Sequence, residues 1–487
     1  MTFLNIIAAI DRNLGIGYDG KIPWRVHADL EYFRNTTWGS ILIMGRKTWE
    51  SISPVARKFE GRDGVVVLTG KDRESKCEDF VQFAKNLSAA IAKAWKRYEY
   101  LGRKCKVFIC GGSEVYFQAM QSYLHLLDSI HLTLVPGQFL TDTYFTVPVS
   151  LFSLVERIQT QFSKVRDPSI LKIQGSVVTI NNLVQKIQRS YPEAPLWFTT
   201  PPDSNYANLI KQVLREGEER PDRTGVGTMS VFDTRLEFDL KDFPLLTRRT
   251  IFWKGVLEET LFFLRGKTNT KELEAKGVNI WKGNTSRAFL DSRGLQDLEE
   301  GDMGGNYGFL WRHFGAEYQH HDSDYREKGV DQIQRVLDLI QNDPTSRRMV
   351  VSAWNPAGED RMSLPSCHIL FQFYVRREKY LDLRMFQRSC DVMLGLPFNI
   401  ASYALIANIF AHKTGLIPGK LSLLLGDTHI YQNHIKGANE FLKRPALPYP
   451  TLFLDFDPDK PIEDLEAKDF QLFEYSSFGP IKMEMAV

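Results

Sequence analysis

The sequence predicts two domains on one chain: an α/β domain with a mostly parallel central sheet and flanking helices, fused to a longer α+β domain. Three observations predict this fold class. The chain has 487 residues, which is more than a single hydrophobic core usually serves. Its first part alternates short β-branched runs with amphipathic stretches, a pattern typical of α/β sheets. A stretch without consistent periodicity then follows, crowded by Pro192, Pro195, Pro201 and Pro202.

We interpret the proline-crowded stretch as a linker over residues 183–204, between a first domain at 1–182 and a second at 205–487. Five β-branched runs in the first domain are predicted strands, at residues 5–10, 40–45, 64–70, 106–112 and 129–135. Residues 87–98 between them have a helical pattern. The second domain opens with a predicted helix at 206–217, and strands and long helices follow it.

Charge and cysteine content narrow the function classes. The 61 basic and 59 acidic residues nearly cancel, which gives no support to a broad RNA-binding surface. Five cysteines without a CxxC pair argue against a disulfide framework and a structural zinc site. The first residues lack a basic leader, and the apolar run at 400–411 is too short to span a bilayer. We therefore expect a cytoplasmic protein without a membrane segment.

Three glycine motifs are candidates for dinucleotide binding. "GIGYDG" (Gly15, Gly17, Gly20) matches GxGxxG, but Pro23 interrupts the helix that a Rossmann motif needs, so we interpret this segment as a mobile loop. "ILIMGRKTWESI" and "VFICGGSEVYFQAM" each combine a strand, glycine and a helix start. A helix N-terminus favours phosphate, so the pair predicts one dinucleotide held twice. Tight turns with solvated cations remain the alternative.

Two basic residues and one acidic residue are further candidates for ligand binding in the first domain. Arg46 and Lys47 follow the first glycine and favour NADP over NAD, because they could bind an extra phosphate. Asp29 shares a helical face with Val26 and Phe33, whereas Glu31 has Arg34 three residues on and is expected to form a solvated ion pair. A buried acid needs a partner. A purely structural role for Asp29 remains open.

In this order the first-domain motifs resemble dihydrofolate reductase over residues 1–182. The resemblance rests on "GIGYDGKIPW", "ADLEYF", "MGRKTWESI", Gly61 with Arg62, "ICGGSEVY" and the strand carrying Thr133. It implies that Asp29 holds the pterin amidine edge and promotes N5 protonation, with Thr133 in support. It also implies that the pterin pocket is lined by Ile7, Ala8, Trp24 and Phe33. The implied carboxylate-binding arginine is Arg62, and the implied NADPH channel is lined by Thr48, Gly111, Gly112, Ser113 and Tyr116.

One residue departs from that family. Cys110 stands where dihydrofolate reductases usually have an aliphatic side chain. A buried thiol behaves as a small hydrophobe, so we expect only an altered pocket shape.

In the second domain, "LPSCHILFQFYV" sets Cys367 beside His368 on a predicted strand. Adjacent strand residues point to opposite faces, so the two cannot readily form a nucleophile and base. A hairpin turning at Arg377 and Glu378 would set Cys367 opposite Arg388, and a guanidinium favours the reactive thiolate. Cys390 is the rival nucleophile, and an inert core thiol is the alternative for either.

Other side chains in this domain suit a phosphate and a proton-transfer group. Arg223, the pair Arg347 and Arg348, and Arg388 beside Ser389 are forked donors that suit a phosphate monoester, although scattered arginines are usually surface residues. On the predicted helix 252–266, Glu258 has Lys254 four residues before it. Glu259 instead has Val256 and Phe263 as neighbours, so it is the predicted buried acid with a raised pKa.

These motifs in order resemble thymidylate synthase over residues 205–487, through "DRTGVGT", "PTSRR", "LPSCH", "QRSCDVMLGLPFNIASYA", "GDTHIYQNH" and "IKMEMAV". The resemblance implies that Cys367 attacks C6 of deoxyuridylate (dUMP) in a homodimer. It implies phosphate binding by Arg223, Gln387, Arg388 and Ser389, joined by Arg347 and Arg348 from the other subunit. It further implies that Asn399 contacts uracil and that His429 and Tyr431 contact the deoxyribose. The residues implied in proton transfer are Glu259, Tyr307 and His368, and those implied to face the folate are Trp281, Asn284 and Asp391.

The synthase resemblance also has one departure. The usual Thr-Lys-Arg positions are Arg248, Arg249 and Thr250. Arg249 keeps the charge expected for the folate tail, while the neutral Thr250 leaves that contact open.

Together the two halves resemble the fused reductase–synthase of protozoa and plants. The expected reactions are methylenetetrahydrofolate-dependent methylation of dUMP to dTMP and NADPH-dependent reduction of dihydrofolate, with no metal and no membrane partner. Two alternatives from other classes are an RNA-binding regulatory protein and a scaffold with one inactive site. No motif favours either of them.

Overall fold

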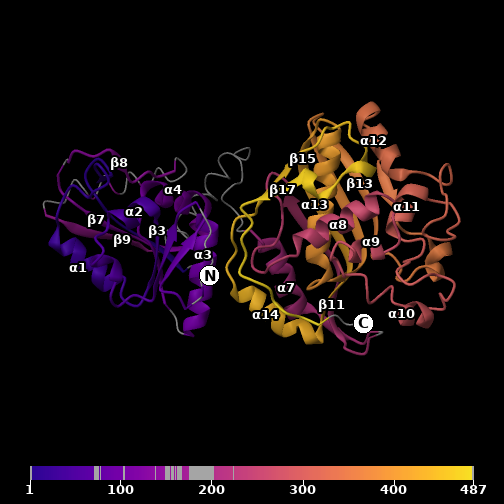
Figure 1. The fold of residues 1–487 in the computed structure, drawn as a ribbon, viewed down its shortest axis with the longest axis horizontal. Coiled ribbons are helices and arrows are strands. Elements are labelled where there is room, and N and C mark those ends of the chain that lie inside the picture. The colour runs from indigo at the N-terminus through magenta and orange to yellow at the C-terminus, as the bar shows by residue number, and fades with distance from the viewer. Residues whose placement is uncertain are drawn as a thin grey trace. The chain divides into compact units, whose positions relative to one another are not determined.

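The computed structural model describes residues 3–484 apart from 71–75, 77, 103–104, 138, 149–153, 155–157, 159–160, 162–166, 175–201 and 223. Most of the predicted linker therefore lies outside the described residues. The chain divides into two compact units (Figure 1). The first comprises residues 1–202 with 443–448 and 476–479, and the second comprises 203–442, 449–475 and 480–487. Among the described helices, none combines the length and apolarity that crossing a bilayer requires.

The first unit is built on a seven-stranded sheet in the order β5-β4-β3-β6-β1-β7-β9. All neighbours are parallel except β7 and β9. The five predicted strands are confirmed as β1 (Leu4–Ile10), β3 (Ile41–Gly45), β4 (Gly64–Leu68), β6 (Val107–Ile109) and β7 (Leu127–Leu134), with β5 (Val81–Ala84) and β9 (Ser169–Gln174) at the edges. Their runs are almost wholly buried, as in parallel sheets covered on both faces.

The helices whose bounds are described in this unit are α1 (His27–Thr36), α2 (Arg46–Ser51), α3 (Leu87–Leu101) and α4 (Ser113–Ser122). Helix α3 matches the predicted helix; the Asn86 side chain caps its start, and it ends at Gly102 in the left-handed region (φ 62°). Helix α1 differs because none of its residues is fully buried. Its inner face is only half covered, which makes this side of the sheet available for a ligand site.

Two short segments from late in the chain complete the hydrophobic core of the first unit. Leu447 is 0% exposed and Phe478 is 2% exposed within this core. The Phe478 ring packs edge-on against Trp95 at 5.4 Å, and a His125 ring nitrogen lies 2.9 Å from the Ala446 carbonyl oxygen. The core of the first unit is therefore not contiguous in the sequence.

The second unit contains a six-stranded sheet in the order β10-β11-β15-β14-β13-β12. The strands are β10 (Glu218–Arg220), β11 (Thr228–Asp239), β12 (Val350–Ser352), β13 (His368–Arg376), β14 (Tyr380–Asp391) and β15 (Ile417–Tyr431). Only β14 and β15 pair in parallel. The mixed sheet with separate helices agrees with the predicted α+β class.

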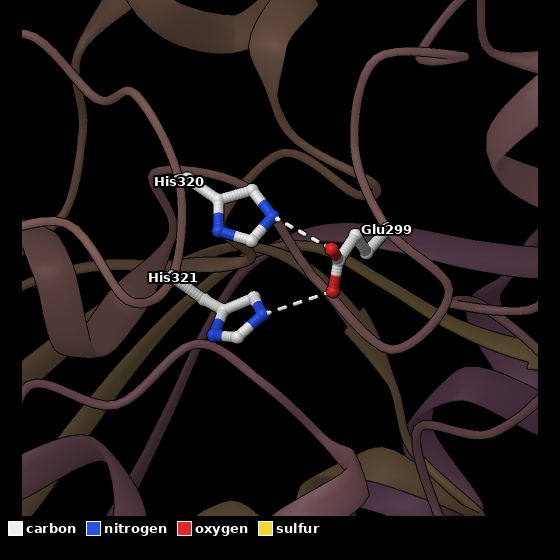
Figure 2. Close-up of side chains that lie close together, drawn as sticks. All are labelled: Glu299, His320 and His321. Carbon is white, nitrogen blue, oxygen red and sulfur yellow. Dashed lines mark hydrogen bonds and ion pairs between the residues drawn. The ribbon is translucent and has the colours of Figure 1, made fainter.

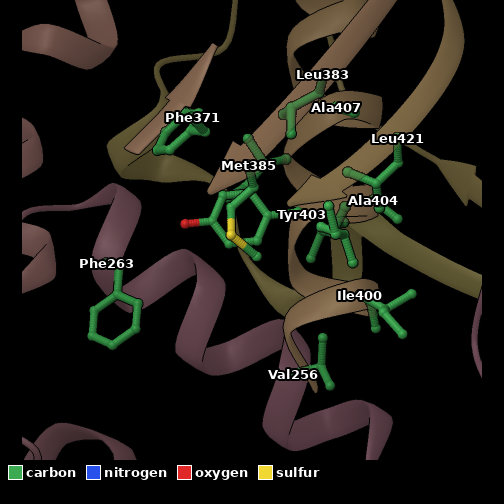
Figure 3. Close-up of a cluster of buried hydrophobic side chains, with 14 of the residues drawn as sticks. Val256, Phe263, Phe371, Leu383, Met385, Ile400, Tyr403, Ala404, Ala407 and Leu421 are labelled. Carbon is green, nitrogen blue, oxygen red and sulfur yellow. The ribbon is translucent and has the colours of Figure 1, made fainter. Parts of the chain in front are cut away.

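Helix α13 (Gly395–Lys413) packs on β14 and β15 of this sheet, and helix α8 (Trp253–Leu264) packs on α13. Figure 3 shows Phe263 of α8 and Tyr403 of α13 in the same core as Phe371 and Met385 from the strands. Helix α13 is buried nearly all round, which is typical of a central core helix.

The remaining elements lie around these sheets. The other helices are α7 (Ser204–Glu216), α9 (Lys271–Glu274), α10 (Arg287–Ser292), α11 (Tyr307–His313), α12 (Gln332–Asn342) and α14 (Ile435–Lys443). Two small strand pairs are β2 (Gly15–Gly17) with β8 (Thr143–Tyr144), and β16 (Thr451–Leu454) with β17 (Phe470–Phe473). Short 3₁₀ turns are η1 (Ala56–Lys58), η2 (Leu124–Leu126), η4 (Pro356–Arg361), η5 (Gln432–His434), η6 (Ile462–Asp464) and η7 (Ala467–Asp469).

The predicted hairpin is β13 and β14, and Arg377 and Glu378 at its turn have φ values of 55° and 53°. His368 faces Gln387, and the backbone N–H of Arg388 donates to the Cys367 carbonyl at 2.9 Å. The expected pairing of Cys367 with Arg388 is therefore confirmed. A β-bulge then shifts the pairing by one residue nearer the turn, which the single predicted register did not include.

The other face of the same sheet carries a row of apolar side chains. Leu370 pairs with Phe386, and Phe386 pairs with Leu424. All three are half-buried, whereas the residues that follow them in the strands, Phe371, Gln387 and Leu425, are buried. Tyr374, farther along β13, is 65% exposed. We call Leu370, Phe386 and Leu424 the outer apolar row.

Candidate functional sites

A carboxylic acid on helix α1 is the centre of the candidate site in the first unit. Asp29 is half-buried, and the Thr133 hydroxyl on β7 donates to Asp29 Oδ1 at 2.5 Å. Burial raises the pKa of Asp29, and this hydrogen bond partly opposes the rise. No cation pairs with Asp29 among the described residues. Glu31 is exposed, but its expected ion pair with Arg34 does not form in the described part of the chain, because exposed pairs gain little from holding one geometry.

A chain of polar side chains beside Asp29 was missed from the sequence. The Tyr32 hydroxyl lies 2.6 Å from His131 Nδ1, and His131 Nε2 lies 2.7 Å from Ser129 Oγ. The Ser129 hydroxyl donates to Asn5 Oδ1 at 2.6 Å, and the Asn5 amide nitrogen donates to two backbone carbonyls. Since the serine proton points to Asn5, His131 donates from Nε2 and accepts from Tyr32 at Nδ1.

This chain attaches helix α1 to the sheet. Burial, followed by the charges of Lys172 and Lys106, lowers the pKa of His131 to about 4, so the ring is neutral near pH 7. A signal for it was present in the sequence. Ser129, His131 and Thr133 are alternate polar residues in an otherwise apolar strand, and all three are buried. Buried polar residues need partners, and here those partners position the helix that carries Asp29.

The predicted pterin-pocket residues lie on β1, α1 and the loop before α1. Ile7 and Ala8 are 6% and 8% exposed on β1, Phe33 is half-buried, and the Trp24 ring packs against Phe139 at 5.1 Å. The Arg62 guanidinium lies over the Phe33 ring at 5.6 Å from its centre. Arg62 also donates to the Thr37 hydroxyl oxygen at 2.9 Å, so its position is fixed at the C-terminal end of α1.

Cys110 follows strand β6. Burial raises the pKa of its thiol well above the usual range. The thiol is therefore neutral near pH 7, consistent with the expected role as a small hydrophobic side chain.

The two predicted phosphate-binding turns are neighbours in space. Gly45 caps α2 and Gly112 caps α4, and the Gly45 N–H donates to the Gly111 carbonyl at 2.8 Å. A Cβ added at Gly112 would lie 3.3 Å from the Thr48 hydroxyl, so the backbone there is closely approached. The two turns therefore lie side by side, which is compatible with the prediction of one dinucleotide held at both.

Side chains around these turns connect them to the rest of the unit. The Tyr116 hydroxyl donates to the Ile7 carbonyl at 2.7 Å, and the Ser113 hydroxyl donates to the Tyr144 carbonyl at 2.5 Å. Arg46 pairs with Glu50 at 3.1 Å on the exposed surface, and Lys47 is exposed. Both cations are therefore accessible to an anionic ligand.

The "GIGYDG" segment opens no helix, as expected, because α1 begins only at His27. It differs from the expected mobile loop in one respect. Gly15–Gly17 forms strand β2 and pairs with β8. A period-2 pattern too short to notice in the sequence is stabilised here by a partner from residues 143–144.

In the second unit, the two candidate nucleophiles differ in their surroundings. Cys367 is half-buried, and its backbone N–H donates to the Tyr307 hydroxyl oxygen at 2.7 Å. Cys390 is 0% exposed, and burial raises the pKa of its thiol. Cys390 is therefore a neutral core thiol, which leaves Cys367 as the accessible candidate.

The imidazole of His368 contacts two tyrosines. Its ring stacks on Tyr307 at 4.1 Å, and its Nδ1 lies 2.7 Å from the Tyr403 hydroxyl. Burial lowers the pKa of His368 to about 3, so the imidazole is neutral. The interpretation that strand alternation separates His368 from Cys367 agrees with these contacts.

Arg388 is held at the residues that precede Cys367. Its Nε donates to the Ser366 carbonyl at 2.9 Å, and a terminal nitrogen donates to the Pro365 carbonyl at 3.1 Å. The guanidinium lies over the Trp354 ring at 5.3 Å. Three contacts therefore fix a cation beside the Cys367 segment.

The other predicted phosphate ligands are arranged differently. Gln387 is 3% exposed and donates to the Ser389 carbonyl at 2.9 Å. Arg347 and Arg348 are exposed before β12, and within the described residues neither guanidinium forms a hydrogen bond or ion pair. Arg223 lies outside the described residues.

Glu259 has the raised pKa that was predicted. The Trp281 indole N–H donates to Glu259 Oε1 at 2.7 Å, and burial raises the pKa of this acid to about 7. The expected pairing of Glu258 with Lys254 was wrong. Glu258 is 6% exposed, more deeply buried than Glu259, and it pairs with Lys276 at 2.7 Å rather than with Lys254. The helix is covered on both sides, so a cation distant in the sequence reaches Glu258.

The remaining predicted contacts lie on β14, β15, α13 and the turn before α10. Asp391 accepts the backbone N–H groups of Met393 and Leu394 at 2.9 and 3.1 Å. His429 Nδ1 lies 2.9 Å from Asp427 Oδ1. Tyr431 and Asn399 are half-buried and Asn284 is buried, while Arg249 is buried and Thr250 is exposed.

Comparisons with known proteins divide at the same region of the chain. Residues 3–169 match the dihydrofolate reductase family model, and residues 204–487 match the thymidylate synthase model. Three relatives named bifunctional dihydrofolate reductase-thymidylate synthase come from Zea mays, Paramecium tetraurelia and Leishmania major. They are 37%, 37% and 36% identical; each alignment covers 99% of this chain and 96%, 98% and 95% of the relative.

Proposed function

Because the chain belongs to the bifunctional dihydrofolate reductase–thymidylate synthase family, we propose that its two catalytic sites are centred on Asp29 and Cys367. The enzyme methylates dUMP to dTMP with methylenetetrahydrofolate, and it reduces dihydrofolate to tetrahydrofolate with NADPH. The first reaction releases the dihydrofolate that the second consumes. One chain thus supplies thymidylate and regenerates its folate.

In the reductase site, Asp29 binds the amidine edge of the pterin and promotes protonation at N5. A half-buried acid with a raised pKa and one hydroxyl donor supports this role, because it can bind a cationic pterin edge and holds its proton to a higher pH than an ordinary carboxyl group does. Ile7, Ala8, Trp24 and Phe33 form the apolar walls. Arg62, fixed at the C-terminal end of α1, binds the glutamate carboxylate.

NADPH supplies the hydride for this reaction. The adjacent turns at Gly45 and Gly111 fit its diphosphate, since glycine lets an anion approach the backbone and α4 begins there. Thr48, Gly112 and Ser113 line this surface, Tyr116 connects it to β1, and the exposed Arg46 and Lys47 bind the additional phosphate.

In the synthase site, Cys367 Sγ adds to C6 of dUMP, and C5 becomes nucleophilic toward the methylene carbon of the folate. The observation that carries this proposal is the half-buried Cys367 with Arg388 anchored on the two preceding carbonyls, because a fixed guanidinium favours thiolate. Arg388 also binds the phosphate, together with Arg223, Gln387, Ser389, and Arg347 and Arg348 of a second copy.

The other synthase residues hold the ligands and move protons. Glu259, with a pKa of about 7, can take up or release a proton through ordered water at neutral pH. Tyr307 and His368 lie beside Cys367 and take part in this proton transfer together with Glu259. Asn399 reads the uracil edge, His429 and Tyr431 contact the deoxyribose, and Trp281, Asn284 and Asp391 face the folate.

The enzyme acts as a homodimer through the synthase sheet. The outer apolar row and the 65% exposed Tyr374 support this part of the proposal, since a partly exposed apolar sheet face is a typical protein interface. A two-fold interface would also bring Arg347 and Arg348, unpaired within the described residues, to the partner's phosphate.

We place the enzyme in the cytoplasm and assign its reductase domain to residues 1–182, its linker to 183–204 and its synthase domain to 205–487. None of the four described cysteines forms a disulfide bond, which supports a reducing compartment.

The test of the proposal uses one purified preparation. Dihydrofolate-dependent NADPH oxidation and dUMP-dependent dihydrofolate release should both occur, and loss of both would refute the enzyme assignment. A 5-fluorinated deoxyuridylate with methylenetetrahydrofolate should form a covalent adduct. Peptide mass spectrometry should map it to Cys367, and Cys367→Ala should prevent it while NADPH oxidation continues. An adduct mapped to Cys390 would contradict the assigned nucleophile.

A further inference from the structure

Two adjacent histidines and a glutamate form a cluster in the second unit (Figure 2). His320 Nε2 lies 3.7 Å from Glu299 Oε1, and His321 Nε2 lies 3.3 Å from Glu299 Oε2. These three side chains are the sole group of this kind in the described part of the chain whose ligand atoms lie within 4.8 Å of one another. We call them the histidine–glutamate cluster.

The proton positions on His320 follow from its other contact. Its Nδ1 lies 2.7 Å from Asp322 Oδ1. A carboxylate only accepts hydrogen bonds, so Nδ1 carries the proton. In the neutral ring, Nε2 therefore presents a lone pair toward Glu299.

The hydrogen bonds of Asn269 bear on the proton position of His321. The Asn269 amide oxygen accepts the Lys271 backbone N–H at 3.0 Å, which turns the amide NH₂ toward His321 Nε2 at 3.2 Å. When Nε2 accepts this N–H it carries a lone pair and does not donate to Glu299 Oε2 at 3.3 Å. In this tautomer two imidazole lone pairs and two carboxylate oxygens face one another, an arrangement that a positive charge between them stabilises.

A neighbouring acid increases this stabilisation. Asp302 is 0% exposed, and within the described residues its Oδ2 has no hydrogen-bond partner. Asp302 pairs with Asn269 in a β-bridge, and Asn269 contacts His321. A divalent cation can supply the missing positive charge.

We propose that the histidine–glutamate cluster binds one zinc ion through His320 Nε2, His321 Nε2 and Glu299, with water as the fourth ligand. Ligand atoms around a tetrahedral zinc ion with bonds of about 2.0–2.1 Å lie roughly 3.3–3.4 Å apart, close to the two separations observed here. Asp322 on His320 Nδ1 is the type of partner that orients metal-bound histidines. Zinc would replace the Asn269 N–H as the partner of His321. The site is separate from the residues assigned to the two reactions.

The test is equilibrium dialysis of the full-length, tag-free enzyme against zinc chloride after chelator treatment, with bound zinc counted by elemental analysis. The wild type should bind one more zinc ion per chain than the His320→Ala/His321→Ala double variant. Asp322→Asn should keep the site with affinity lowered about 10- to 100-fold. His27→Ala, at an exposed histidine outside the cluster, should bind zinc as the wild type does.

Reductase and synthase turnover of the double variant should stay at wild-type levels, which excludes misfolding as the cause of lost zinc. Equal zinc binding by the wild type and the double variant would overturn the proposal, since the cluster would then be held by protons alone. An Asp322→Asn variant that binds zinc as tightly as the wild type would remove the assigned role of that aspartate.

Discussion

Asp29 and Glu259 are acids that are partly shielded from water. Among the described residues, no cation pairs with either of them to offset the free-energy cost of burying a negative charge. Each has one donor, the Thr133 hydroxyl for Asp29 and the Trp281 indole for Glu259. Burial is the larger effect at both, so the pKa of each is raised. Acids of this kind can exchange protons closer to neutral pH than ordinary carboxyl groups.

Replacing Asp29 by Asn should lower the rate of dihydrofolate reduction by about 10²- to 10⁴-fold, the range for losing a positioned proton-transfer group. The amide keeps the shape of the side chain and removes its charge. The measurement is NADPH oxidation at pH 7, with dTMP formation by the same sample as the control. An Asp29→Asn enzyme that reduces dihydrofolate at the wild-type rate would show that Asp29 has no role in the chemistry.

The raised pKa of Glu259 predicts a pH-dependent stability. The folded state binds this proton more tightly than the unfolded state, so the stabilisation is full below about pH 4.5 and is lost as pH rises through about 7. Relative to Glu259→Gln, which cannot ionise, the wild type should lose unfolding free energy across this window. Urea unfolding of both proteins at several pH values measures the difference. Parallel pH curves for the two would contradict the assigned pKa.

Helix α1 carries Asp29 and has no fully buried residue. Hydrophobic packing therefore contributes less to its position than it does for α3, which buries much of one face. The polar chain from Tyr32 through His131 and Ser129 to Asn5 supplies a directed attachment instead. Such a chain fixes orientation, because each hydrogen bond constrains the next.

Tyr32→Phe removes only the hydroxyl that reaches His131. One hydrogen bond contributes about 0.5–1.5 kcal/mol, so kcat/KM for dihydrofolate should fall about 2- to 10-fold if the bond positions Asp29. KM for NADPH should stay unchanged. His131→Gln, which can both accept and donate, should retain more reductase activity than His131→Ala. Unchanged kcat/KM in Tyr32→Phe would show that the attachment does not affect catalysis.

At the scale of the molecule, the synthase site is proposed to draw on two chains. Arg347 and Arg348 are exposed in the single chain, while Cys367 and Arg388 come from one hairpin. A two-fold interface would repeat the arrangement, so that each nucleophile meets the arginines of the partner.

Mixing two inactive variants tests this sharing. In a dimer of Cys367→Ala with Arg348→Glu, one site has both lesions and the other has none. Random exchange makes half of the dimers mixed, so about a quarter of wild-type synthase activity should return. The measurement is dTMP formation after subunit exchange, with exchange verified by differently labelled chains. No recovery despite complete exchange would show that the arginines act within their own chain.

The sequence by itself determined the features that depend on neighbours within a few residues. The five parallel strands follow from short β-branched runs, and helix α8 and the turn at Arg377 and Glu378 follow from local periodicity and polarity. The separation of Cys367 from His368 follows from strand alternation alone. The motifs around Asp29 and Cys367 also determined the family, because the order of many short motifs is specific.

The tertiary structure decided the contacts that join distant parts of the chain. Glu258 pairs with Lys276 rather than Lys254, Tyr32 reaches His131 almost a hundred residues away, and Phe478 packs on Trp95 in the first unit. Periodicity shows which face of an element is buried, but it does not show which side chain from elsewhere meets that face. That choice depends on how whole elements pack, because burial and polar satisfaction are properties of the assembled core.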